Sequence, residues 1–195
     1  MARWQPNASE RLMIAALDLF EERGYENTTV IEVAKRAGLA KSTFFRHFPD
    51  KREVLFGGET MAERVTDAIT AAPATATPLE AVAHALDAVG REVFTPARRE
   101  FIARRRAVIA TNPELQERLA LKGLGLTRSM VGALKSRGVP DLTSSVAAEL
   151  GALAWKIADD RWSDEANGDE FSKVARRALD EVQAASALCQ RETSS

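Results

Sequence analysis

The chain has 195 residues, of which 45% are hydrophobic and 28% charged, which is enough for a sizeable core and excludes a disordered tail. Its 27 Lys and Arg residues against 28 Asp and Glu residues give a net charge of −1, which excludes a uniformly basic protein but allows a local basic face. Because Cys189 is the one cysteine and the chain has two histidines, we expect no disulfide, no metal site and no cofactor. No apolar signal core opens the chain and no stretch approaches the ~20 apolar residues of a membrane span, so we expect a cytoplasmic protein without membrane contact.

Apolar residues recur at helical spacing almost throughout the chain, and no segment alternates with period two for long. This pattern predicts an all-α fold of nine helices without strands. One short helix is expected between Thr29, which forms a capping box with Glu32, and Gly38, which supplies a left-handed stop. The other eight helices are expected at residues 9–23, 40–48, 51–65, 78–93, 96–110, 113–136, 143–163 and 168–188.

Residues 71–77 carry no charge and no large apolar side chain, which predicts a linker loop between a domain at 6–66 and a domain at 78–190. Gly57 and Gly58 fall inside the expected fourth helix, where two glycines cost about 2 kcal/mol relative to alanine. A hinge and close packing against a neighbour explain this pair equally well.

The segment from Thr28 to Lys51 has the layout of a helix-turn-helix unit, with two short helices joined through Gly38 and an amphipathic helix before them. In such units the second helix is presented to the major groove of DNA. Residues 33–52 hold six Lys or Arg residues and one acid, Asp50, which makes a local charge of +5. Docking to phosphates requires such a charge, but a solvated basic surface fits the charge equally well.

The run G-Y-x-x-T-T-V-x-x-V-A-x-x-A-G, followed by L-A-K-S-T-F-F-R-H-F-P-D-K, resembles the DNA-binding domain of tetracycline-repressor-like regulators, the TetR family. The resemblance covers residues 9–66. It implies a nine-helix homodimer whose three-helix head binds a palindromic operator in double-stranded DNA. It also implies a carboxy-terminal helical bundle for dimerisation and for a small-molecule effector that releases the DNA. The run S-T-F-F-R, with an arginine run followed by N-P-E-L-Q-E-R, is similar to the regulators grouped with mycofactocin systems.

The resemblance implies DNA contacts for eight residues of this chain. Thr28 and Thr29 match positions that meet a phosphate at the start of a helix. Lys41, Ser42 and Thr43 match the exposed first turn of the recognition helix. For His47 a packed histidine, and for Lys51 a surface lysine, fit the sequence equally well. The eight residues are Thr28, Thr29, Lys41, Ser42, Thr43, Phe45, His47 and Lys51.

Two residues of the recognition helix depart from the family pattern. Phe45 stands where the family usually has tyrosine, so the hydroxyl that would bond a phosphate is missing. Ala40 replaces the usual serine cap, which costs the helix about 1 kcal/mol unless another group caps it. We expect Phe44 and Phe48 to be core residues that fasten this helix to the first one.

The expected helix at 143–163 is apolar on two sides and must therefore be covered on two sides. One stripe comprises Val146, Leu150, Leu153 and Ile157, and the other comprises Ala148, Gly151, Ala152, Trp155 and Trp162. We expect this helix and the helix at 168–188 to form a four-helix bundle across a two-fold axis, although a central helix in a monomer fits the periodicity equally well. The expected interface residues are Ala148, Gly151, Ala152, Trp155, Phe171, Val174 and Ala178.

The helix at 96–110 places Arg105 in the middle of its apolar face, with Arg98 on the same side. An inward arginine is costly unless it is paired. One interpretation is a buried ion pair with an acid such as Glu149, Asp159 or Asp160. The other is a cavity in which the arginine receives the anionic group of an amphipathic, acyl-type effector. The candidate ligand-binding residues are Phe94, Arg98, Phe101, Arg105, Met130 and Trp155.

Two other classes of protein compete with a ligand-responsive regulator. A small helical enzyme is disfavoured because the chain has no G-x-x-x-x-G-K-[ST], G-x-S-x-G or H-E-x-x-H motif, so we expect no catalytic residues. A ligand-independent architectural DNA-binding protein would share the helix-turn-helix unit but would need no cavity. Measuring operator binding with and without lipophilic metabolites distinguishes the architectural protein from the ligand-responsive regulator.

Overall fold

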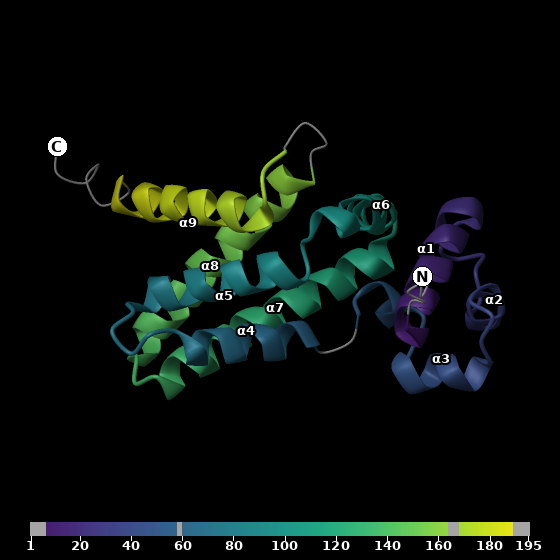
Figure 1. Cartoon of the computed structure of the whole chain (residues 1–195), viewed down its shortest axis with the longest axis horizontal. Coiled ribbons are helices and arrows are strands. Elements are labelled where there is room, and N and C mark those ends of the chain that lie inside the picture. The colour runs from purple at the N-terminus through teal and green to yellow at the C-terminus, as the bar shows by residue number, and fades with distance from the viewer. Residues whose placement is uncertain (1–6, 58–59, 164–167, 189–195) are drawn as a thin grey trace, which may run out of the picture. The chain divides into compact units, whose positions relative to one another are not determined.

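The structure is a computed structural model that describes residues 7–57, 60–163 and 168–188. These residues form nine α-helices and two short 3-10 helices, and no strand occurs among them, which confirms the predicted all-α fold (Figure 1). None of the helices in these ranges is both long and apolar enough to cross a membrane. The elements are α1 (Ala8–Arg23), α2 (Val30–Arg36), α3 (Lys41–His47), η1 (Arg52–Leu55), α4 (Thr60–Ala71), α5 (Pro78–Glu92), η2 (Pro96–Arg98), α6 (Arg99–Ala110), α7 (Pro113–Ser136), α8 (Asp141–Trp162) and α9 (Phe171–Leu188).

The chain divides into two compact units whose boundary differs from the predicted one. The head unit combines the described residues up to Thr60 with Glu100–Leu121, and the body unit contains Met61–Arg99 and the described residues from Lys122 onward. The sequence-based prediction assigned all of 78–190 to the second domain. Residues 100–121 belong to the head because their apolar side chains share its buried cluster, as Val108, Ile109 and Leu115 do with Leu12 and Phe20.

Ion pairs reinforce this assignment of residues 100–121 to the head unit. Arg104 of α6 pairs with Asp18 and Glu21 of α1, and these carboxylates raise the pKa of the arginine. Arg118 of α7 pairs with Glu53 of η1, whose side chain is almost fully buried. Because a buried carboxylate is costly without a partner, these pairs specify which part of the chain covers the head.

The expected continuous helix at 51–65 is wrong. Residues after α3 form the short η1, and α4 begins only at Thr60. Between them Gly57 has φ of +70°, a left-handed conformation that glycine adopts without the steric cost of a Cβ atom. A Cβ atom there would lie 3.9 Å from Met13 Cε, so backbone conformation, and not close packing, explains this glycine. Gly58 lies outside the described residues.

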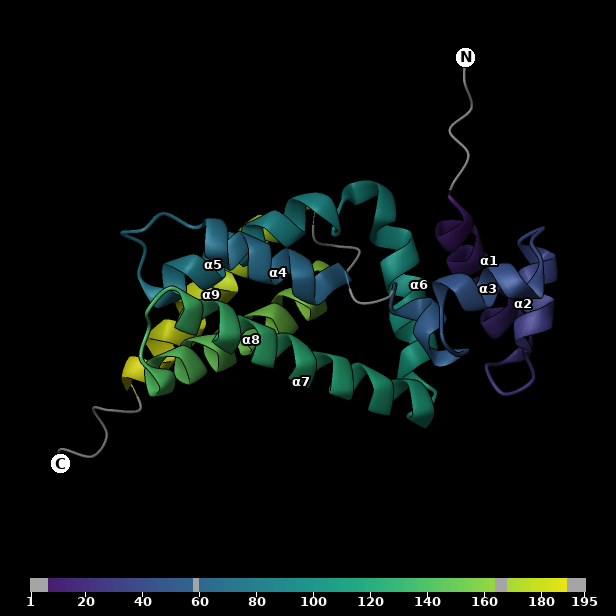
Figure 2. The same ribbon diagram turned by 90° about the horizontal axis from the view of Figure 1, so that it is seen from below.

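The body unit is organised by close packing among α5, α8 and α9 (Figure 1 and Figure 2). Its α5 begins with a capping box, in which Thr77 N donates to Glu80 Oε2 at 2.7 Å. The ring of Phe94 stacks on that of Phe171 with centroids 4.0 Å apart. Arg137, after α7, donates to the carbonyl oxygens of Ala72 at 2.8 Å and Pro73 at 2.6 Å, which ties the end of α4 to the α7–α8 turn. The predicted linker accordingly lies between α4 and α5.

The predicted dimer interface is wrong for most of its residues, because they form the core of the body unit itself. Ala148, Gly151, Phe171, Val174 and Ala178 are buried within the single chain, and Ala152 and Trp155 are half-buried. A Cβ atom at Gly151 would overlap Val82 Cγ1, so α5 and α8 approach closely at this point. The other stripe of α8 remains exposed, with Leu142 at 77%, Val146 at 51% and Leu153 at 48%.

Two glycine-to-alanine substitutions should therefore change stability in opposite directions. Gly151→Ala places a methyl group against the stiff, β-branched Val82 and should lower the free energy of unfolding by about 1–3 kcal/mol. Gly132→Ala, on an exposed position of α7 with no atom within 4 Å of the new methyl group, should raise it by up to about 1 kcal/mol through helix propensity. Urea denaturation followed by circular dichroism measures both. A Gly151→Ala protein as stable as the wild type would contradict the α5–α8 contact.

Candidate nucleic-acid interface

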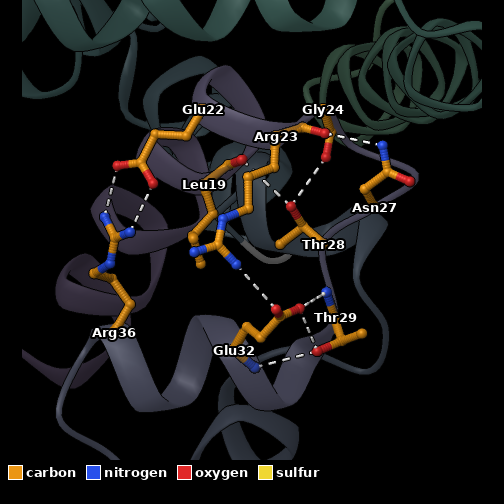
Figure 3. Close-up of polar contacts among 9 residues, drawn as sticks. All are labelled: Leu19, Glu22, Arg23, Gly24, Asn27, Thr28, Thr29, Glu32 and Arg36. Carbon is orange, nitrogen blue, oxygen red and sulfur yellow. Dashed lines mark hydrogen bonds and ion pairs between the residues drawn. The ribbon is translucent and has the colours of Figure 1, made fainter.

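The start of α2 is held by the capping box that the sequence predicts. Thr29 N donates to Glu32 Oε2 at 2.8 Å, and Glu32 N donates to Thr29 Oγ1 at 3.3 Å (Figure 3). The bond from the Thr29 amide, together with that from its hydroxyl, lowers the pKa of Glu32 below its usual range. Thr29 is exposed, so it lies where a DNA phosphate can approach the beginning of α2.

Thr28 has a different place from the predicted one. Its side chain is 1% exposed, and its hydroxyl lies 2.9 Å from the carbonyl oxygen of Gly24 and 3.3 Å from that of Leu19 (Figure 3). Its amide donates to the Tyr25 carbonyl at 3.2 Å. Both donors are committed inside the α1–α2 turn, so the expected phosphate contact does not fit Thr28.

The turn between α2 and α3 needs a glycine. Gly38 has φ of +67°, and a Cβ atom there would lie 2.9 Å from Arg11 Nη2. Arg11 reaches this point because it donates to the carbonyl oxygen of Ala37. A bidentate pair between Arg36 and Glu22, at 2.7 and 2.9 Å, also fastens α2 to α1 and lowers the pKa of Glu22 (Figure 3). The angle at which α3 leaves the turn is therefore set by several contacts.

Helix α3 turns one face into the core and the opposite face to solvent. Phe44 and Phe48 are buried in the same cluster as Leu19 and Phe20, which confirms their predicted core role. Thr43 is half-buried. The exposed side chains of α3 are Lys41, Ser42, Phe45, Arg46 and His47.

Arg46 is a candidate DNA contact that the family resemblance did not supply. It lies four residues after Ser42, so both occupy the middle of the face opposite Phe44. Its Nη2 lies 3.3 Å from Thr43 Oγ1, which keeps the guanidinium over the exposed face. Helical spacing from Ser42 is the signal that identifies this residue.

The structure assigns partners to several of the basic residues that make up the local charge of +5. Arg36 is paired with Glu22, and Arg52 with Asp50 at 2.9 Å. Lys51 Nζ donates to the Tyr25 carbonyl at 2.9 Å and lies 3.9 Å from the centre of the Tyr25 ring. Lys51 thus anchors the chain after α3 to the α1–α2 turn, and its contact with the DNA backbone remains a prediction.

The candidate ligand-binding residues are divided between the two units. Phe94 and Met130 are buried in the body unit, where Phe94 also contacts Trp155, with ring centroids 5.6 Å apart. In the head unit Phe101 packs on the core, and Arg105 Cζ lies 5.2 Å from the centre of the Phe56 ring. Arg98 ends η2 and is half-buried. A common pocket for these residues and the ion-pair alternative for Arg105 both remain predictions.

Comparison with known proteins finds a family and two relatives that match the helix-turn-helix segment. Residues 12–56 match the family described as "Bacterial regulatory proteins, tetR family". The transcriptional regulator TcmR of Streptomyces glaucescens is 40% identical over 77 residues, which cover 39% of this chain and 34% of TcmR. The regulator YuxN of Bacillus subtilis is 43% identical over 47 residues, which cover 24% of this chain and 16% of YuxN. The match thus spans about a third of TcmR and less of YuxN.

Solved structures share the fold over most of the chain. The structure titled "SmeT-Triclosan complex" has a TM-score of 0.60 at 18% identity and covers 92% of this chain and 91% of its own. NalD of Pseudomonas aeruginosa, a secondary repressor of the MexAB-OprM efflux pump, has a TM-score of 0.58 at 17% identity, covering 91% and 95%. The matched segment is thus a helix-turn-helix segment of the kind found in bacterial regulatory proteins. The chain matches the TetR family in residues 12–56 and shares the fold of these solved structures over most of its length. Its membership of the mycofactocin-linked subset stays a prediction.

A serine at position 40 should stabilise α3. Ala40 has the extended backbone of a helix cap, with φ −77° and ψ 151°, but no side-chain oxygen to accept an amide hydrogen. Ala40→Ser should raise the free energy of unfolding by about 1 kcal/mol. The control is Ala107→Ser, at an exposed position inside α6. There the lower helix propensity of serine should reduce the free energy of unfolding by a few tenths of a kcal/mol. Equal effects of the two substitutions in urea denaturation would contradict the cap geometry.

Proposed function

We propose that the chain is a ligand-responsive repressor of transcription that binds a palindromic operator in double-stranded DNA as a homodimer. The observation that carries the proposal is the exposed polar and basic face of α3, backed by the buried Phe44 and Phe48 within a TetR-family head. A short helix held in this way enters the major groove as a rigid unit. The proposed contacts come from Thr29, Lys41, Ser42, Thr43, Phe45, Arg46, His47 and Lys51.

The outer stripe of α8 supports the homodimer. Leu142, Val146 and Leu153 are spaced by four and seven residues, so they lie on one face, directly opposite the buried Gly151 and Ala158. This much exposed apolar surface on one helix is typical of an interface between subunits. A second copy fits it because a two-fold axis lays the same stripe against itself. The interface thus uses the face of α8 opposite to the one predicted from sequence.

A small-molecule effector is the proposed signal. The solved complex of SmeT with triclosan, whose chain shares this fold, supports a small molecule as the class of ligand. For this chain we propose an amphipathic or lipophilic molecule, because the candidate residues combine aromatic rings with arginine side chains. A ligand-independent architectural DNA-binding protein is the alternative, and operator release in the presence of amphipathic acids distinguishes the two.

DNA recognition is tested by selecting bound sequences from random DNA and measuring the affinity of variants for the selected operator. Lys41→Ala and Arg46→Ala should each weaken specific binding by about 1–3 kcal/mol if the side chain contacts a base edge. Replacing a residue that contacts only a phosphate should instead weaken binding to all DNA sequences alike. It should also lower the slope of log affinity against log salt concentration by about one unit. The exposed Arg91 of α5 provides a matched control, Arg91→Ala, which should leave affinity unchanged. Intact operator affinity in both α3 variants would contradict the proposal.

The dimer is tested by placing a charge on the outer stripe. Leu153→Glu should yield a folded monomer at micromolar concentration, because two carboxylates would be desolvated at the two-fold interface. Gln183→Glu, at an exposed position of α9, is the control and should leave the assembly unchanged. Sedimentation velocity measures the assembly, and circular dichroism checks the fold. A Leu153→Glu protein that sediments as the wild type would show that the outer stripe is not the interface.

A further inference from the structure

Phe45 is the one large apolar side chain on the exposed face of α3, and nearly half of it, 48%, is exposed. Its neighbours on this face are lysine, serine, arginine and histidine. This exposure does not result from poor packing of the side chain. The Phe45 ring meets the buried Phe44 ring edge to face, with centroids 5.6 Å apart, and Lys41 Nζ lies 5.7 Å from its centre. The ring is therefore held in place while it leaves apolar surface in water.

The chemistry of a phenyl ring restricts what it can recognise in a DNA groove. It has no hydroxyl, so it cannot donate to a phosphate oxygen, and it cannot pair with the donors and acceptors on base edges. The apolar group that unmodified DNA presents in the major groove is the C5-methyl group of thymine. Covering that methyl group with the ring removes apolar surface of both partners from water.

The position of Phe45 on α3 brings it to the same base pairs as the polar residues. It lies three residues after Ser42 and four after Lys41, so all three occupy adjacent positions on the helix surface. One helical turn rises about 5.4 Å, and base pairs are stacked about 3.4 Å apart, so these side chains span one to two base pairs. Lys41 Nζ beside the ring supplies the positive charge that the neighbouring phosphates or guanines attract.

We propose that Phe45 is a specificity-determining residue that reads the C5-methyl group of a thymine in each half-site of the operator. This inference rests on the proposed function and adds to it the identity of one base. The affinity of the protein for its operator then depends on the methyl group itself and not only on the hydrogen-bonding pattern of the A·T pair.

Replacing thymine by uracil removes this methyl group and leaves the hydrogen-bonding edge unchanged. With the operator selected from random DNA, each thymine is replaced singly and affinity is measured by fluorescence anisotropy. One replacement in a half-site should weaken wild-type binding about fourfold, and the symmetric double replacement about fifteenfold, as expected for one methyl-sized group buried per site. The other thymines serve as internal controls.

The protein variants then assign the effect to Phe45. Phe45→Ala should bind the thymine and uracil operators equally, and Phe45→Leu, which keeps an apolar side chain, should retain part of the preference. Because nearly half of the side chain is exposed, both variants should fold, and circular dichroism checks this. If the preference for thymine over uracil persists unchanged in Phe45→Ala, another residue contacts the methyl group and the inference is overturned. Sequence-selective binding with no thymine sensitive to uracil would overturn this inference alone, whereas a chain that selects no sequence would overturn the proposed function as well.

Discussion

The burial of Phe44 and Phe48 is the constraint on which the functional face depends. Helix α3 has only seven residues and begins at an alanine without a side-chain cap, so it is too short to be stable by itself in water. Its stability comes from the two aromatic rings in the head core. Because these rings fix the rotation of α3, Ser42 and Arg46 must face solvent. The same burial that stabilises the helix thus orients its proposed contact residues.

Ion pairs within the head determine which of its basic residues remain exposed for the proposed contact with DNA. Glu22 and Asp50 take up Arg36 and Arg52, and the acids of α1 hold Arg104. These pairs brace the head, while Lys41 remains at the exposed face of α3. A count of charges along the sequence therefore overstates the electrostatic field at the proposed DNA-binding face, because several charges neutralise each other locally.

The two apolar sides of α8 have separate roles. The inner side, around Gly151, allows close contact with α5 and completes the core of the body unit. The outer side, around Leu153, leaves apolar surface that a second subunit covers in the proposed dimer. Folding and assembly therefore use opposite faces of one helix, and a charge placed at Ala148 would test the core instead of the interface.

The sequence by itself determined the features that depend on contacts within one or two helical turns. It predicted most of the helices, the capping box of Thr29 and Glu32, the glycine stop at Gly38 and the helix-turn-helix unit, because each arises from residues close together in the chain. Only the tertiary structure decided that Thr28 is buried, that residues 100–121 belong to the head, and which stripe of α8 is inside. Periodicity shows that a face is apolar but not what covers it, since the partner surface lies on a distant part of the chain. The break after η1 escaped prediction because helical spacing continues across Gly57, whose left-handed backbone appears only in the folded chain.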